Sequence, residues 1–99
     1  MDAMKGEIHV FYVVASALDG NQLALPAGKR YEMMLFMRQK KGTDDDWDLA
    51  KKTMSEAGFE NIEIGKADYV ASEKLKGMDP EFTDCYECAL VNGSAFLIY

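Results

Sequence analysis

The first apolar run of the sequence places hydrophobic side chains at both alternating sets of positions. One set comprises Ile8, Val10, Tyr12 and Val14, and the other comprises His9, Phe11, Val13 and Ala15. A strand with two apolar faces is typical of a sheet centre, or of a strand whose second face is covered by a helix or a partner. The turn sequence Asp19-Gly20-Asn21 ends the run, and residues 22–29 predict a loop.

Residues 30–39, RYEMMLFMRQ, repeat this pattern. Tyr31, Met33, Leu35 and Met37 line one face, and Glu32, Met34, Phe36 and Arg38 line the other. The two runs therefore predict an antiparallel pair of strands joined by a long connection. Met34 and Phe36 then need a cover of their own, which is either a second layer of the same domain or an interface with another chain.

Residues 44–57 show the clearest helical pattern. Trp47, Ala50, Met54 and Ala57 form one apolar stripe. Thr43 or Asp44 suits the N-cap position, and the aspartates that follow suit the positive end of the helix dipole. Gly58 favours the left-handed conformation that commonly ends a helix.

Residues 61–70 predict a third strand, in which the apolar phase changes at Gly65 and indicates a bulge or a bend. Asp79-Pro80 begins a second helix, Asn92-Gly93 ends it, and residues 94–99, SAFLIY, form a last short strand. The order β-β-α-β-α-β predicts a single α+β domain over residues 1–99. We expect a two-layer sandwich in which two helices cover one face of a four-stranded, mostly antiparallel sheet.

The last strand carries no proline or lysine that would discourage pairing with another strand. At the edge of a sheet, such a strand favours association. We therefore expect Phe96 and Ile98, together with Met34 and Phe36, to form an interface with a protein partner or within a homodimer.

Seventeen acidic residues outnumber eleven basic ones and give a net charge of −6. That balance argues against direct binding to nucleic acid and favours a solvated surface or a basic protein partner. No apolar run approaches the roughly 20 residues of a membrane helix, so we expect no membrane contact. With no pattern typical of an export signal and only two cysteines, the sequence indicates a cytoplasmic protein with reduced thiols.

Cys85 and Cys88 have the spacing of a redox dithiol or of half a metal site. A redox pair sits at a helix N-terminus, whereas Cys85 falls in the second turn, beside acidic residues that raise the pKa of a thiol. A structural zinc needs four ligands, and the only histidine, His9, is distant in sequence. We expect Cys85 to pack in the core and Cys88 to lie at the surface, with a reactive Cys85 as the weaker alternative.

The acidic run TDDDWD, residues 43–48, lacks the central glycine and the final glutamate of a calcium loop, so helix capping explains it better. His9 is in phase with Phe11 and Val13, which predicts a partly buried, hydrogen-bonded imidazole and leaves proton transfer as a weaker alternative. No pattern for a cofactor or a metal is found.

Two functions remain. The first is a small acidic inhibitor, immunity-type or regulatory protein that occludes a larger protein partner and catalyses nothing. The alternative is a dimeric α+β domain with a small-ligand pocket or a simple acid/base site at the sheet face, for which the candidates are His9, Tyr12, Tyr31 and Glu32. The lack of an assembled catalytic set favours the first.

Overall fold

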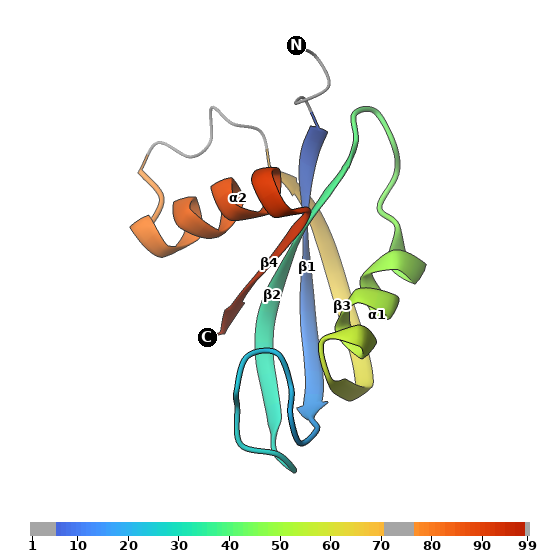
Figure 1. Ribbon diagram of the computed structural model, residues 1–99. Helices are drawn as coiled ribbons and strands as arrows, with labels where there is room; N and C mark the ends of the chain where they lie inside the picture. Colours follow the sequence, from blue (N-terminus) through green and yellow to red (C-terminus); the bar gives the residue numbers. More distant parts are fainter. Residues whose placement is uncertain (1–5, 71–76, 99) are drawn as a thin grey trace.

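The computed structural model describes residues 6–70 and 77–98 (Figure 1). The elements in these residues are β1 (Gly6–Ala17), β2 (Arg30–Lys40), α1 (Trp47–Glu56), β3 (Phe59–Val70), α2 (Pro80–Asn92) and β4 (Ser94–Ile98). This order is the one that the sequence predicts. Neither helix of the described part is long and apolar enough to span a bilayer.

β1 lies inside the sheet, whose strand order is β3-β1-β2-β4. It pairs antiparallel with β2 from Gly6 opposite Lys40 to Ser16 opposite Arg30, and it pairs antiparallel with β3 on its other side. β4 pairs antiparallel with β2. The predicted α+β fold with a four-stranded antiparallel sheet is confirmed, and β1 takes the inner position that its two apolar faces indicate.

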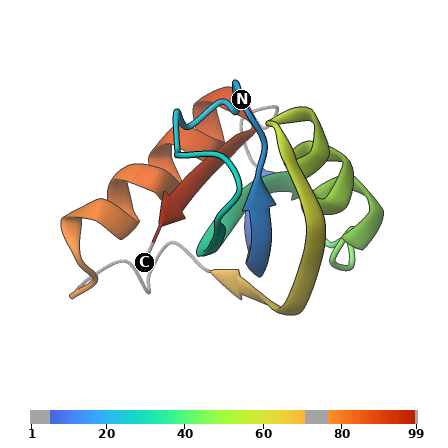
Figure 2. The ribbon, with the colours of Figure 1, turned by 90° about the horizontal axis from the view of Figure 1, so that it is seen from below.

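The two helices cover opposite faces of the sheet (Figure 2), which corrects the prediction that both lie on one face. Alternate residues of β1 join different clusters: Phe11 packs with Met54 of α1, whereas Val10 packs with Tyr86 of α2. We call these clusters the α1 core and the α2 core. Since both faces of β1 and β2 are apolar, one helical layer would leave the other face in water.

β3 is irregular at two places. Tyr12 lies opposite Lys66 but Val13 lies opposite Ile64, so the pairing skips Gly65 and the bulge predicted there is confirmed. A second register shift lies near Asn61, which has a φ of 52° and which the apolar pattern did not reveal. Bulges of this kind bend a strand and increase its twist.

α1 starts three residues later than predicted, at Trp47. Its N-cap is Asp46, whose carboxylate accepts a hydrogen bond of 3.0 Å from the backbone N–H of Leu49. Thr43 and Asp44 lie before the helix, where they bond to the side chain of Gln39 instead. At the other end, Gly58 has a φ of 100°, as expected of the residue that ends a helix.

Asn21 organises the loop between β1 and β2. Its side chain is buried, donates hydrogen bonds to the carbonyls of Leu18 (2.8 Å) and Leu25 (2.7 Å), and accepts one from the N–H of Leu25 (2.9 Å). The loop backbone packs against the end of α1 so closely that a Cβ at Gly58 would lie 2.6 Å from the Cα of Asn21. Gly58 therefore satisfies both a turn and a close backbone approach.

This double requirement makes Gly58→Ala more destabilising than a change of backbone conformation alone. Gly20→Ala is the matched control, because Gly20 also has a positive φ (76°) but has no atom within 4 Å of an added Cβ. We expect Gly20→Ala to cost about 1 kcal/mol in the free energy of unfolding and Gly58→Ala to cost about 1–3 kcal/mol more because of the clash. Chemical denaturation measures both, and equal losses would show that the close approach carries no cost.

Candidate functional site

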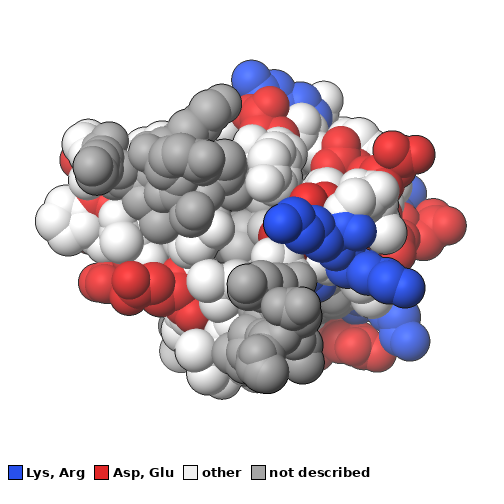
Figure 3. Space-filling model, turned by 90° about the horizontal axis from the view of Figure 1, so that it is seen from above, with Lys and Arg blue, Asp and Glu red and all other residues white. Residues whose placement is uncertain are grey.

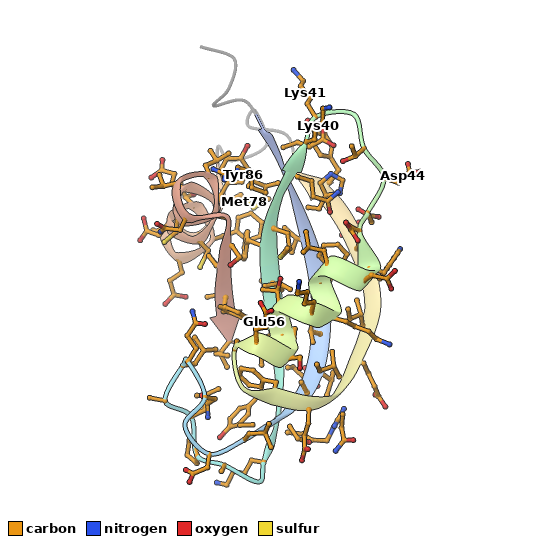
Figure 4. All side chains as sticks on the ribbon, turned by 45° about the vertical axis from the view of Figure 1, so that its right-hand side comes forward. Lys40, Lys41, Asp44, Glu56, Met78 and Tyr86 are labelled. Atoms are coloured by element: carbon orange, nitrogen blue, oxygen red, sulfur yellow. The ribbon has the colours of Figure 1, made fainter. Side chains whose placement is uncertain are left out.

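The connection between β2 and α1 lines a hollow at the surface. Residues 43–49, TDDDWDL, are named here the acidic segment. Together with Arg38, Gln39 and Lys40 they line a hollow of about 610 Å³. Figure 3 shows that charged side chains gather on the α1 side of the upper end, and Figure 4 places Lys40 and Lys41 at the end of β2 and Asp44 on the outer side of the loop that follows.

Gln39, at the end of β2, holds the acidic segment mainly through hydrogen bonds to the backbone of the segment. The side-chain amide is buried and donates hydrogen bonds to the hydroxyl of Thr43 (3.1 Å) and to the carbonyl of Asp44 (2.7 Å). Its amide oxygen accepts a hydrogen bond of 3.1 Å from the N–H of Asp46. A single side chain therefore fixes the loop at Thr43, Asp44 and Asp46, so the loop is ordered before any partner arrives.

His9 of β1 holds the same segment through the side chain of Asp45. Its Nδ1 lies 2.5 Å from a carboxylate oxygen of Asp45, and its Nε2 lies 2.8 Å from a carboxylate oxygen of Glu7. The imidazole is 3% exposed, and the ring of Tyr69 in β3 lies against it at 5.9 Å between centroids. Ionised carboxylates only accept hydrogen bonds, so this arrangement is fully satisfied when both ring nitrogens donate, which is the case in the protonated imidazole.

The charges around His9 decide its protonation. Burial by itself lowers the pKa of His9, but the hydrogen bonds to Asp45 and Glu7 and the charges of both carboxylates together outweigh burial and raise the pKa above 6.5. The hydrogen bond from His9 holds the pKa of Glu7 below 4.5, with the Gly42 backbone and Lys41 adding smaller contributions in the same direction. A cluster of two partly buried carboxylates around the buried imidazolium of His9 thus links β1 to the acidic segment.

This cluster leaves His9 poorly suited to proton transfer with a substrate. Both of its nitrogens are engaged by carboxylates, and a general base needs a nitrogen within reach of the reacting proton. Of the other acid/base candidates, Tyr31 lies on the α1 side of the sheet, where its hydroxyl donates to the carbonyl of Pro26 (3.3 Å). Tyr12 lies on the α2 side, over which Lys66 sits at 5.2 Å, so the candidates are divided between two faces.

Trp47 is the exposed centre of the acidic segment. Its indole makes an edge-on contact with Phe11 at 5.4 Å between ring centroids, yet the residue is 44% exposed. Leu49, 39% exposed, lies in the same hollow. The apolar stripe predicted for this helix is correct for Ala50, Met54 and Ala57, which are buried, but Trp47 at the first position reaches past the edge of the core.

The structure places the predicted interface residues in different environments. Phe36 has no exposed surface and contacts Phe82 of α2 at 4.9 Å between ring centroids, so it is a core residue rather than an interface residue. Met34 is partly buried in the same α2 core. Phe96 packs against the α1 core, and Ile98 is 37% exposed on β4. α2 is therefore the second layer that covers Phe36.

The two cysteines are free thiols in contrasting positions. Cys85 packs against the α2 core, with its sulfur 3.5 Å from the carbonyl oxygen of Phe96. Burial raises the pKa of Cys85, with Cys88, Asp84 and Glu81 adding to the increase. Cys88 is exposed and accepts a hydrogen bond of 3.4 Å from Asn92. Among the described residues, no three histidine, cysteine or acidic side chains are grouped as metal ligands.

Comparisons of the chain with protein-family models, with curated proteins and with solved structures find no match. We therefore infer function from the geometry of the site. The features that sequence reasoning missed are the cluster of Glu7, His9 and Asp45 and the exposure of Trp47. The partial signal for the first was a lone histidine in phase with core residues, which predicted a hydrogen-bonded imidazole without naming its partners.

The pKa shifts predict a stability maximum in mildly acidic solution. Because the pKa of His9 is raised, its contribution to the free energy of unfolding is complete below pH 6.5. This contribution is lost as the pH rises through the higher folded-state pKa. The lowered pKa of Glu7 means that its contribution is complete above pH 4.5 and is lost as the pH falls through the lower folded-state pKa. We expect His9→Gln to reduce the free energy of unfolding by about 1–3 kcal/mol between these values and to flatten the profile.

Denaturation followed by the fluorescence of the single tryptophan measures this profile, and NMR titration of the single histidine measures its pKa. Glu7→Gln should lower the free energy of unfolding above pH 4.5. Its control is Asp68→Asn, which removes the same charge from an exposed pair with Lys66. A profile that is unchanged in His9→Gln, or a His9 pKa below 6.5, would contradict the assignment.

The thiols differ in their predicted reactivity. Each can be measured alone in the variants Cys85→Ala and Cys88→Ala. We expect Cys85 to react with iodoacetamide at neutral pH more slowly than Cys88, because Cys85 is partly buried and its pKa is raised. A Cys85 that reacts faster than a small model thiol would restore the redox hypothesis.

Proposed function

We propose that the protein acts by binding a protein partner with a basic surface, as an inhibitor, immunity-type or regulatory module without catalysis, and that the acidic segment makes the contact. One observation carries this proposal. Trp47 is half-exposed between Asp46 and Asp48 on a segment that buried His9 and Gln39 hold in place.

The composition of the surface supports binding to protein. Tryptophan is among the residues that contribute most at protein interfaces, particularly when polar residues surround it. Leu49 extends the apolar surface beside it. Aspartates around an apolar centre attract a basic partner at long range, and the net charge of −6 acts in the same direction.

The fixed conformation of the acidic segment favours tight binding of a partner. The hydrogen bonds from Gln39 and His9 fix the loop before binding, so little conformational entropy remains to be lost on association. The aspartates of the acidic segment also set the charge of the hollow. Arg38 lines it, but its guanidinium donates a hydrogen bond of 2.6 Å to the carbonyl of Leu90 in α2, so a basic side chain of the partner is directed to the aspartates on the α1 side.

The alternative, a ligand pocket or acid/base site at the sheet face, has less support. Its candidate groups lie on both sides of the sheet, and both nitrogens of His9 are engaged. We propose that this activity takes place in the cytoplasm, where the two cysteines of the chain would remain reduced.

Site-specific crosslinking in the native cells tests the proposal. A photoreactive phenylalanine analogue replaces Trp47 in one variant and Val91, which is 76% exposed on α2, in the control. We expect position 47, and not position 91, to capture one partner in a stoichiometric adduct. The adduct should be lost when Asp44 and Asp48 are both changed to Asn.

The charge control is the double change of Glu81 and Glu87 to Gln on α2, which removes the same charge elsewhere and should leave the adduct intact. With the purified partner, Trp47→Ala should weaken binding at least about tenfold, the effect of an interface residue that dominates affinity. No adduct at position 47 beyond that at position 91, or equal binding by Trp47→Ala, would refute the proposal.

A further inference from the structure

β4 is an edge strand whose outer side is unpaired within the residues that the structure describes. Its sequence, Ser94–Ile98, is uncharged and contains no proline. The opposite edge strand, β3, differs in both respects. It carries Glu60, Glu63, Lys66 and Asp68 and is bent by two bulges, which are the features that prevent strands from adding to an edge. Only the β4 edge therefore keeps the properties of a template for another strand.

The register shows which backbone groups of β4 face outward. Arg38 donates a hydrogen bond of 2.9 Å from its N–H to the carbonyl of Gly93, and Met37 lies opposite Ser94. Hydrogen-bonded residues alternate in an antiparallel pair, so Ala95 and Leu97 bond to β2. The N–H and carbonyl groups of Ser94, Phe96 and Ile98 consequently point away from the sheet.

The position of Cys85 agrees with this register. Its sulfur lies 3.5 Å from the carbonyl oxygen of Phe96, an approach that requires this carbonyl to face away from β2. A thiol is a weak donor and a carbonyl has two lone pairs, so the Phe96 carbonyl keeps the capacity to accept a backbone hydrogen bond.

A hollow of about 490 Å³ lies along this edge. Asp84, Cys88 and Asn92 of α2 line it, together with Phe96 of β4 and Gln22 of the β1–β2 loop. The lining combines an apolar ring, amide groups and outward backbone groups with one carboxylate, Asp84, and it contains no basic residue.

We propose that the β4 edge binds an extended segment of a partner protein, which adds a fifth strand to the sheet and places a lysine or arginine against Asp84. The backbone groups of Ser94, Phe96 and Ile98 supply the hydrogen bonds of the added strand. We infer a basic partner segment because α2 contains Glu81, Asp84 and Glu87 and no basic residue.

The same acidic residues disfavour a second copy of this chain as the occupant. Antiparallel pairing of two β4 strands would continue one sheet through a twofold axis perpendicular to it, and this axis would place both α2 helices on the same face. Their carboxylates would then face each other with no basic residue from either helix, which costs binding energy. A basic segment instead neutralises them.

Amide hydrogen exchange of the full chain, followed by NMR, tests the proposal with a seven-residue peptide in which lysine and valine alternate. In the protein alone, we expect the amides of Phe96 and Ile98 to exchange quickly and those of Ala95 and Leu97 slowly. Adding the peptide should slow exchange at Phe96 and Ile98 at least several-fold. A peptide of alternating glutamate and valine should have no such effect.

Four variants make the test specific. Ile98→Pro removes an N–H that points outward and makes no hydrogen bond to β2, so it should abolish the protection. Slow exchange at Ala95 in this variant would show that the strand is intact. Asp84→Asn should weaken peptide binding about two- to fivefold, whereas Glu81→Gln, which removes a charge outside the hollow, should not. Trp47→Ala should also leave binding unchanged, so this result is independent of the function proposed for the acidic segment.

Three results would overturn the proposal. The first is the absence of protection at millimolar lysine–valine peptide. The second is equal protection by the glutamate–valine peptide. The third is protection of Phe96 and Ile98 without any peptide that increases with protein concentration, because it would assign the edge to a second copy of the chain.

Discussion

The burial of both faces of β1 is the constraint on which this fold depends. Val10 and Phe11 are successive residues, both fully buried, and they point to opposite sides of the sheet. Each such side chain stabilises the folded state by about 1.5–3 kcal/mol if it is removed from water. Neither face can be left open, so each needs its own helix, and the connections of the chain must pass over both sides.

These connections also place the two surfaces that we propose for binding. To cover β1 on one side, α1 joins β2 to β3, and the acidic segment must turn from the end of β2 onto that face, where His9 and Gln39 anchor it. To cover the other side, α2 joins β3 to β4, and β4 pairs outside β2. The outer position of this short strand is thus a consequence of the topology that buries the α2 core.

Local patterns predicted the elements well because each depends on neighbours in sequence. The alternation in residues 8–15 and the cap at Gly58 are of this kind, as is the phase change that revealed the bulge at Gly65. The faces covered by the helices were not predictable in the same way, because a strand that is apolar on both sides is compatible with either helix on either face. The placement of α2 over Phe36 required the three-dimensional path of the chain.

The candidate site was hidden from the sequence for a related reason. His9 and Asp45 are 36 residues apart, and nothing in their spacing indicates that the chain brings them together. The exposure of Trp47 follows from the late start of α1: Asp46 caps the helix, so Trp47 occupies its first position, at the margin of the core. A stripe drawn by helical phase alone counts that position as buried.

Because of the way in which Gln39 holds the acidic segment, the backbone conformation of this loop depends little on most of its side chains. Two of its three hydrogen bonds go to the backbone of Asp44 and Asp46 rather than to their side chains. Asp44, Trp47 and Asp48 can therefore be replaced during evolution while the loop keeps its course, with Asp45 retained for His9. A fold of this kind could diversify its partners by point substitution at a few exposed positions, with little cost to the stability of the scaffold.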